Sequence, residues 1–140
     1  MKYRIPRHIS ICTWRSAAFA LPLFVLATGP VAAQTDNEAK FCTERDLGGT
    51  CFTVKKGGGS VDLSARGMND KISSVKVGKN VNVRAFDQTN WTGACILFEG
   101  QAGGALYSAL SGNVMSDGLS ADNRITSYQV GPLTYKCPSK

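Results

Sequence analysis

Two six-residue stretches of the sequence follow one pattern: Asn69-Asp70-Lys71-Ile72-Ser73-Ser74 and Asp122-Asn123-Arg124-Ile125-Thr126-Ser127. Each has two Asn or Asp residues, any two residues, a hydroxyl residue and then Ser. Carboxylate, amide, carbonyl and hydroxyl oxygens are the ligands that Ca²⁺ prefers, and short polar side chains let a loop turn back on itself. One match arises by chance in about one chain in a hundred of this length. Two copies therefore indicate a calcium-binding pattern.

An aromatic residue and a glycine precede each polar stretch in the same order. Phe41 is followed seven positions later by Gly48, and Phe86 by Gly93, so both members of the pair recur after 45 residues. This order predicts an internal duplication. The second unit has about eight extra residues between its glycine and its polar stretch, in the Gly/Ser-rich segment Ala102–Ala121. We expect this insertion to form a surface loop.

These residues resemble the βγ-crystallin family, whose domains contain two Greek-key units, each with an aromatic–glycine hairpin and the polar calcium motif. The resemblance covers roughly residues 40–130. It implies an all-β, two-sheet Greek-key sandwich of two internal repeats. The first Greek key is expected at about 40–79, the second at about 80–130, and a C-terminal tail at 131–140. In this family the hairpin glycine adopts a backbone conformation that disfavours a Cβ, which we expect of Gly48 and Gly93.

Short segments rich in β-branched and aromatic residues predict the same fold class from the residues alone. Polar and apolar residues alternate most clearly in Val81–Phe86, and no segment after residue 33 has helical periodicity over three turns. The segments expected to form strands are Lys40–Thr43, Cys51–Val54, Ile72–Val77, Val81–Asp87, Cys95–Glu99, Leu106–Ala109 and Ile125–Val130.

The first 33 residues differ from the rest in composition. Four basic residues and no acidic residue accompany the apolar run Ala17–Ala27, and Val31-Ala32-Ala33 places small residues before Gln34. This pattern is typical of a secretory signal peptide, and eleven apolar residues are too few to span a bilayer comfortably. We therefore expect a signal peptide at 1–33, cleaved near Ala33, and one small domain at 34–140. The product would be a secreted or periplasmic monomer without a membrane span.

Removal of this segment also removes most of the positive charge. The whole chain carries +6, whereas residues 34–140 have 12 Lys or Arg and 10 Asp or Glu. So small a surplus predicts no nucleic-acid partner. Lys55-Lys56 precedes Gly57-Gly58-Gly59 between two strand-like segments. We expect a hairpin turn there, because a phosphate-binding loop needs its glycines to open a helix.

Four cysteines follow the signal peptide: Cys42, Cys51, Cys95 and Cys137. An even number in a small exported domain predicts two disulfides, for which three pairings are possible. We favour Cys42–Cys51, which would cross the first hairpin, and Cys95–Cys137, which would tie the tail to the second unit. A four-cysteine zinc site is the alternative, but the chain has no Cys-x2-Cys pair after the signal peptide.

The resemblance implies that about two calcium ions are each held by both polar motifs. The third residue of one motif offers its backbone carbonyl, and the fifth residue of the other offers its hydroxyl. One site would then contain Asp70, the Lys71 carbonyl and Thr126. The other would contain Asn123, the Arg124 carbonyl and Ser73.

The same resemblance implies roles for the neighbouring residues. Further carbonyl ligands are expected from Cys42 and Asp87, Asn69 and Asp122 are expected to brace the loops, and Ser74 and Ser127 to hold them shut. The alternative is that both motifs are Asx-type turns, whose side chains bind only the chain's own amides.

Catalysis is not expected. His8, the only histidine, lies in the signal peptide, so the remaining chain has no imidazole for a triad or a catalytic zinc. No spacing singles out a catalytic pair of carboxylates. The resemblance does imply a different function as an alternative, because small secreted metalloproteinase inhibitors share this fold. The insertion Ala102–Ala121 would then be the reactive loop, and a secreted protease the partner.

Overall fold

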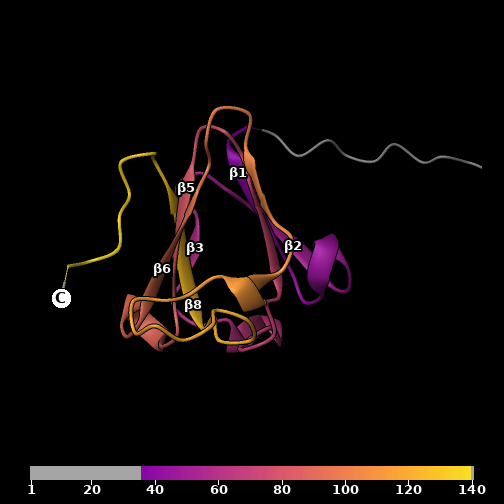
Figure 1. The fold of residues 1–140 in the computed structure, drawn as a ribbon, viewed down its shortest axis with the longest axis vertical. Coiled ribbons are helices and arrows are strands. Elements are labelled where there is room, and N and C mark those ends of the chain that lie inside the picture. Colours follow the sequence, from indigo (N-terminus) through magenta and orange to yellow (C-terminus); the bar gives the residue numbers. More distant parts are fainter. Residues whose placement is uncertain (1–35, 140) are drawn as a thin grey trace, which may run out of the picture. The chain divides into compact units, whose positions relative to one another are not determined.

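The computed structural model describes residues 36–139, so the expected signal peptide and its cleavage site lie outside the described residues. Two antiparallel four-stranded sheets form this domain, with strand orders β2-β1-β4-β7 and β3-β8-β5-β6 (Figure 1). The strands are β1 Glu38–Cys42, β2 Cys51–Lys55, β3 Gly59–Ser60, β4 Ser74–Val77, β5 Asn82–Phe86, β6 Cys95–Glu99, β7 Ala105–Tyr107 and β8 Ser127–Gly131.

Each half of the chain contributes one strand to the sheet of the other half. β3 pairs with β8, with Gly59 opposite Gln129, and β7 pairs with β4, with Tyr107 opposite Val75. The remaining pairs join β1 to β2 and β4, and β5 to β6 and β8. This exchange completes two Greek keys. The predicted all-β, two-sheet Greek-key sandwich is therefore confirmed.

All seven expected strands are present, and their ends differ from the expected ones by at most two residues. The expected hairpin at Gly57-Gly58-Gly59 is wrong. β2 ends at Lys55 in one sheet, whereas β3 begins at Gly59 in the other, so this turn carries the chain between the sheets. The residues indicated a turn, but only the partner strand β8 decides which sheet the next strand joins.

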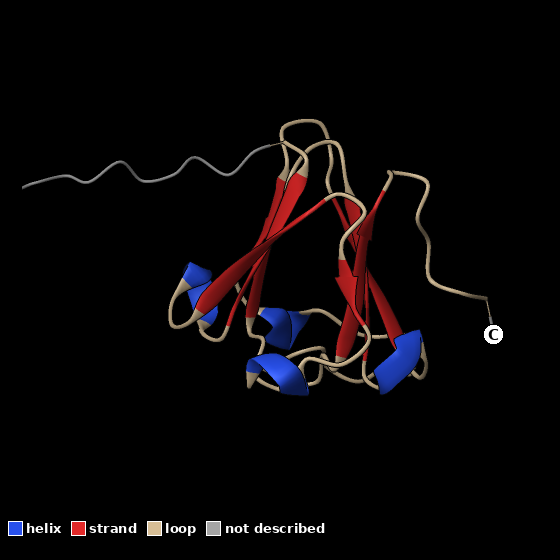
Figure 2. Ribbon diagram, turned by 180° about the vertical axis from the view of Figure 1, so that it is seen from behind, coloured by secondary structure: helices blue, strands red, loops and turns tan. Residues whose placement is uncertain are grey.

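Short 3-10 helices lie in the connections between strands (Figure 2). They are η1 Arg45–Leu47, η2 Ser64–Arg66, η3 Thr89–Trp91 and η4 Leu110–Gly112.

Both sheets contribute side chains to the hydrophobic core. Phe41 of β1 and Tyr128 of β8 are fully buried, and their ring centroids lie 4.6 Å apart. Val75 of β4 and Phe98 of β6 are also fully buried. Burial of each such side chain contributes about 1.5–3 kcal/mol. The core therefore joins the sheets and holds the connecting loops in fixed positions.

Two disulfides link Cys42 to Cys51 and Cys95 to Cys137, which confirms the favoured pairing. Cys42 and Cys51 are direct partners in the register of β1 and β2. The second bond ties the C-terminal tail to the first residue of β6. The Arg84 guanidinium also lies 4.4 Å from the centroid of the Tyr135 ring, which adds a cation–π contact to the tail.

Candidate calcium sites

Two hairpins with the same backbone form lie beside the polar motifs, the first at residues 42–51 and the second at 86–95. Three pairs of positions match in their left-handed φ values. These are Asp46 (53°) with Asn90 (56°), Leu47 (61°) with Trp91 (59°), and Gly49 (70°) with Gly93 (79°). The hairpins therefore repeat after 44 residues.

This register corrects the sequence-based pairing by one residue in the first hairpin. Gly48 has φ −82° and ψ 175°, an extended conformation open to any residue, so its expected special role is wrong. Gly49 is the counterpart of Gly93, and a Cβ at Gly49 would overlap the Thr43 hydroxyl. Cys42 stands where Phe86 stands, because Cys42 pairs with Ser74 as Phe86 pairs with Ser127. Phe41 is a core residue instead.

The first candidate site joins the first polar motif to the second hairpin. The Thr126 hydroxyl lies 3.2 Å from Asp70 Oδ1 and donates a hydrogen bond of 3.0 Å to the Asp87 carbonyl oxygen. The Asp70 amide also donates to the Ile125 carbonyl at 3.2 Å. Asp70 has φ 53°, a conformation that turns the loop back. Three of the expected ligand residues, Asp70, Thr126 and Asp87, thus meet at one point.

The second candidate site has the reciprocal arrangement. The Ser73 hydroxyl donates to Asn123 Oδ1 at 3.2 Å, and the Asn123 amide donates to the Ile72 carbonyl at 3.0 Å. Asn123 has φ 54°, as its counterpart Asp70 does. The structure therefore brings the side chains of each motif to those of the other, as the expected sharing requires.

The carbonyl expected from Cys42 is not the structural counterpart of the one expected from Asp87. The Cys42 carbonyl already accepts the Ser73 amide at 2.9 Å, just as the Phe86 carbonyl accepts the Thr126 amide at 2.8 Å. The register makes Thr43 the counterpart of Asp87. Thr43 Oγ1 accepts the Thr50 amide at 3.0 Å, and Asp87 Oδ1 accepts the Ala94 amide at 2.7 Å. Thr43 was missed because the glycine was placed at 48 instead of 49.

Asn69 and Asp122 hold the first position of each motif, and the structure gives them the same unusual feature. Asn69 Oδ1 and Asp122 Oδ1 are buried, and neither has a hydrogen-bond donor among the described residues. A buried acceptor without a donor costs about 1–3 kcal/mol. A hard cation would supply the missing partner for each oxygen. Both are among the residues that we expect at the metal sites, where they would brace the loops, and nothing in the sequence indicates that their oxygens would lack a donor.

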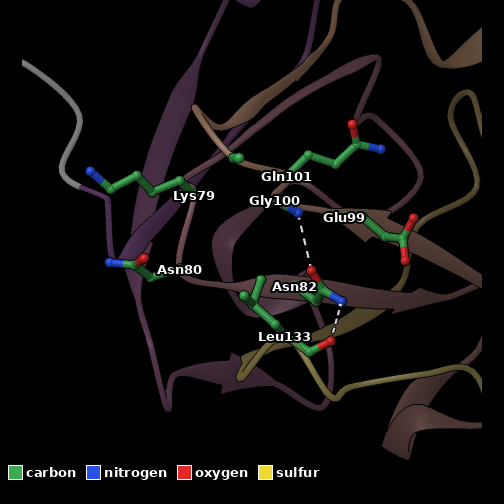
Figure 3. A pocket seen from close by; sticks show the side chains of 8 residues that line it. Lys79, Asn80, Asn82, Glu99, Gly100, Gln101 and Leu133 are labelled. Atoms are coloured by element: carbon green, nitrogen blue, oxygen red, sulfur yellow. Dashed lines mark hydrogen bonds between the residues drawn. The ribbon is translucent and has the colours of Figure 1, made fainter.

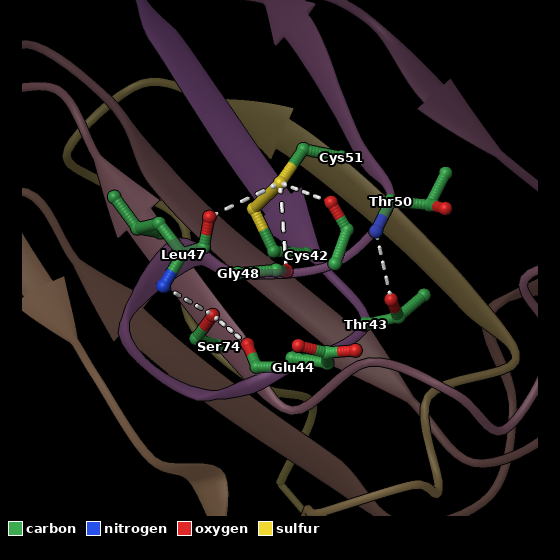
Figure 4. The surroundings of a disulfide bond; sticks show 9 residues. Cys42, Thr43, Glu44, Leu47, Gly48, Thr50, Cys51 and Ser74 are labelled. Carbon is green, nitrogen blue, oxygen red and sulfur yellow. Dashed lines mark hydrogen bonds between the residues drawn. A yellow bond between two sulfur atoms is a disulfide. The ribbon is translucent and has the colours of Figure 1, made fainter.

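Ser74 and Ser127, the last residues of the motifs, hold the hairpins closed. Both are fully buried. The Ser74 hydroxyl donates to the Glu44 carbonyl and accepts the Leu47 amide at 3.1 Å (Figure 4). Ser127 makes the equivalent bonds to the Gln88 carbonyl and to the Trp91 amide, the latter at 3.2 Å. Each hydroxyl thus ties the two ends of its hairpin turn to the strand below it.

The Arg124 side chain modifies the charge of the first site. Its guanidinium pairs with Asp87 Oδ2 at 2.8 Å and with Asp117 Oδ2 at 2.7 Å. The hydrogen bond from Arg124, followed by that from the Leu119 amide, lowers the pKa of Asp117 to about 2. The same contact with Asp117 raises the pKa of Arg124. Asp117 lies in the insertion, and no motif in the sequence pointed to it.

Few of the oxygen ligands at the two candidate sites carry a formal charge. Among residues 36–139 no three His, Cys, Asp or Glu side chains form a group that could hold a metal ion. Hydroxyl, amide and carbonyl oxygens predominate at both candidate sites. Such a set fits a hard cation such as Ca²⁺, and it does not fit zinc, which binds nitrogen and sulfur ligands.

A pocket of about 480 Å³ is lined by other residues, among them Lys79, Asn82, Glu99 and Leu133 (Figure 3). Asn82 is almost fully buried. It accepts the Gly100 amide at 3.1 Å and donates to the Leu133 carbonyl at 2.9 Å. It thus fastens the tail and has no polar atom left over for a ligand. The helices of residues 36–139 are 3-10 turns of three residues each, and none of them could span a bilayer.

Comparison with known proteins gives a consistent result. The sequence model described as Beta/Gamma crystallin matches residues 35–112, more than half of the chain. A betagamma-crystallin from an archaeon is 27% identical, with a TM-score of 0.50, and the match covers 66% of this chain and 94% of that one. No curated protein matches the chain.

A further similar structure is a domain of the Abundant Perithecial Protein of Neurospora crassa in its Ca²⁺-bound form. It is 20% identical, with a TM-score of 0.52, and the match covers 74% of this chain and 98% of that one. A structure described under the evolution of the eye lens beta-gamma-crystallin domain fold is 25% identical, with a TM-score of 0.58. It covers 74% of this chain and 94% of that one.

Proposed function

The chain belongs to the beta/gamma crystallin family, and from this premise we propose that it is an exported, non-catalytic domain that binds about two Ca²⁺. The observation that carries the proposal is the pair of unpartnered buried oxygens, Asn69 Oδ1 and Asp122 Oδ1. Both occupy the same position of the two motifs. Two equivalent cation sites would supply the missing partner to each of these oxygens.

The contacts between the motifs support the same proposal. Thr126 approaches Asp70, and Ser73 approaches Asn123, so each motif completes the oxygen set of the other. The bond from Thr126 to the Asp87 carbonyl shows a main-chain oxygen close to the first of these clusters. On binding, the ion would replace the hydroxyl proton as the partner of these oxygens. The Neurospora crassa relative has been seen in a Ca²⁺-bound form, which favours the same ligand here.

The expected affinity is modest. The first site has the carboxylate of Asp70 and that of Asp87, but Arg124 already neutralises the latter. The second site has the neutral side chains of Asn123 and Ser73 and, in the motif of Asn123, one carboxylate, that of Asp122. Sites with so few formal charges have dissociation constants of roughly 10⁻⁶–10⁻³ M. Such values suit a compartment rich in calcium, in agreement with the proposed export.

Export is supported by the cysteines as well as by the leader sequence. Two disulfides persist in oxidising compartments and are rare in reducing ones. A secreted or periplasmic location would let both bonds form. Protein recovered from culture and analysed by N-terminal sequencing should begin near Gln34, and a chain that still begins at Met1 would contradict cleavage.

Isothermal titration of the oxidised protein with Ca²⁺ tests the proposal directly. We expect about two ions per chain, and a higher melting temperature with millimolar Ca²⁺ than with chelator, because the ions bind only the native state. Asn69→Ala and Asp122→Ala should each reduce this calcium-induced rise in melting temperature. Absence of both heat and a melting shift in the wild-type protein would refute calcium binding.

A second candidate function, inhibition of a secreted protease, is favoured by the insertion. Val114 and Leu119 are 62% and 60% exposed on a loop closed by a β-bridge between Val114 and Ser120. The pairing of Asp117 with Arg124 anchors this loop to the domain. A rigid, exposed, apolar loop suits insertion into a protease cleft. Incubation with a panel of secreted proteases would detect inhibition, and Leu119→Asp should abolish it without unfolding the domain.

A further inference from the structure

The two hairpins have the same backbone form but are fastened by different means. Phe86 is 2% exposed at the position that Cys42 occupies in the first hairpin. Trp91 lies in the second hairpin, and its indole Nε1 is 3.1 Å from the Ser60 carbonyl oxygen and 3.2 Å from that of Tyr128, so it attaches the hairpin to β3 and β8. The counterpart of Trp91 is Leu47, which has no polar side-chain atom to donate such a bond.

Among residues 36–139, the second hairpin also has an ion pair that the first lacks. Arg124 pairs with the Asp87 carboxylate, whereas the counterpart of Asp87 is the neutral Thr43. What the first hairpin has instead is the Cys42–Cys51 bond between facing residues at its base (Figure 4). The Cys95–Cys137 bond does not replace it, because Cys137 lies in the tail and not on the second hairpin.

We propose that the Cys42–Cys51 disulfide makes one of the two calcium sites conditional on oxidation and leaves the other unaffected. The conditional site is the one built from Thr43, Ser73 and Asn123, and the unconditional one is built from Asp87, Thr126 and Asp70. The oxidised protein holds two ions, and the protein with this bond reduced holds one. The loss of one ion on reduction rests on the proposed calcium binding. The opening of the first hairpin on reduction does not.

The chemistry is a thiol–disulfide exchange with an external dithiol. A thiolate of the dithiol attacks one sulfur of the Cys42–Cys51 bond and forms a mixed disulfide, and the second thiolate resolves it. The dithiol supplies two electrons and two protons and leaves as a cyclic disulfide, while Cys42 and Cys51 become thiols. Cys51 is partly exposed, which gives an attacking thiolate access to the bond.

Matched double variants test the proposal. Cys42→Ser/Cys51→Ser removes the bond of the first hairpin, and Cys95→Ser/Cys137→Ser removes the other bond as a control. Calcium titration should find one ion for the first variant and two for the control. The lost site should be weakened at least about tenfold, because ligands held by an open loop must be ordered before they can bind. Two ions of unchanged affinity in the first variant would overturn the proposal.

Amide hydrogen exchange without calcium supplies an independent measurement. In Cys42→Ser/Cys51→Ser the amides of Thr43 and Thr50 should exchange faster than in the wild type, while those of Asp87 and Ala94 stay protected. Equal protection of both hairpins would overturn the proposal even if the protein binds calcium. If only the first hairpin exchanges faster and the protein binds no calcium, the proposed function is wrong. The different fastening of the two hairpins would still hold.

A rescue variant separates a local effect from general unfolding. Cys42→Phe/Leu47→Trp/Cys51→Ala gives the first hairpin the aromatic fastening of the second and removes the disulfide. We expect this variant to keep Thr43 protected and to bind two ions both with and without dithiothreitol. If it behaves like Cys42→Ser/Cys51→Ser, the aromatic residues are not the functional equivalent of the bond, and the proposal is wrong.

Discussion

The hydroxyl oxygen of Thr126 lies 3.2 Å from Oδ1 of Asp70, although 56 residues separate the two in the chain. Ser73 and Asn123 make the matching contact across 50 residues, also at 3.2 Å. Neither motif could assemble these oxygens alone. Any ion bound there would join the two Greek keys, and its binding energy would add to the stability of the whole domain.

Thr126→Val should disable the first site and spare the second. Valine has nearly the same shape but no hydroxyl, so the cluster of Thr126, Asp70 and the Asp87 carbonyl loses one oxygen. We expect one of two ions to be lost in a calcium titration, and the calcium-free protein to be destabilised by only about 1 kcal/mol. Thr92→Val, which removes an exposed hydroxyl bonded to Thr89, is the control. Loss of both ions would contradict separate sites.

Asp122→Ala should not destabilise the calcium-free protein, but it should reduce the stabilisation that calcium provides. It removes a buried oxygen that has no donor, so the calcium-free protein should be as stable as the wild type or more so, by up to about 1 kcal/mol. The calcium-induced rise in melting temperature should shrink. Paired thermal melts in chelator and in millimolar Ca²⁺ measure both effects. Clear destabilisation in chelator would show that Asp122 braces the loop instead.

Gly49→Ala should cost more stability than Gly48→Ala. Gly49 has φ 70° and no room for a Cβ, whereas Gly48 has φ −82°. A left-handed residue that clashes with Thr43 should lose more than about 1 kcal/mol of unfolding free energy. Urea titrations of the two variants, with Gly93→Ala for comparison, decide the order. A larger loss at Gly48 would contradict the repeat of 44 residues.

The contact between Asp117 and Arg124 should persist to unusually low pH. The pKa of Asp117 falls from 3.8 to about 2 in the folded chain. Because the folded pKa is the lower one, the stabilising contribution is complete above about pH 4 and disappears as the pH falls through 2. The Leu119 amide, which donates to Asp117 at 3.0 Å, should report a midpoint near 2 by nuclear magnetic resonance. A midpoint near 4 would mean that the ion pair does not form.

Removal of either disulfide should lower the free energy of unfolding. In the chain-entropy model, closure of the short Cys42–Cys51 loop contributes roughly 3 kcal/mol, and closure of the longer Cys95–Cys137 loop roughly 4 kcal/mol. Denaturant titrations of the two Cys→Ser double variants test these values. A larger loss for the shorter loop would show that its bond stabilises the native hairpin beyond its effect on the unfolded chain.

Much of this protein follows from its sequence. Alternating segments such as Val81–Phe86 and the turn residues between them predicted the strands, because a strand with one buried face must place apolar residues at every second position. The two polar motifs marked both candidate sites without any structural information. The even cysteine count indicated two disulfides, and the favoured pairs are the ones that form.

The tertiary structure decided everything that depends on register between distant segments. Phe41-x6-Gly48 matched Phe86-x6-Gly93 in spacing, but the pairing of Cys42 with Ser74 shows that the true match begins one residue later. Side chains alternate between the faces of a strand, so a shift of one residue sends Phe41 into the core and makes Thr43, not Cys42, the counterpart of Asp87. The sheet joined by β3 and the buried oxygens of Asn69 and Asp122 also arise only when the two Greek keys pack together. The pairing of Arg124 with Asp117 forms within the second unit, where the insertion folds back on the motif. A linear pattern records which residues are available, whereas contacts between halves of the chain depend on how those halves fit.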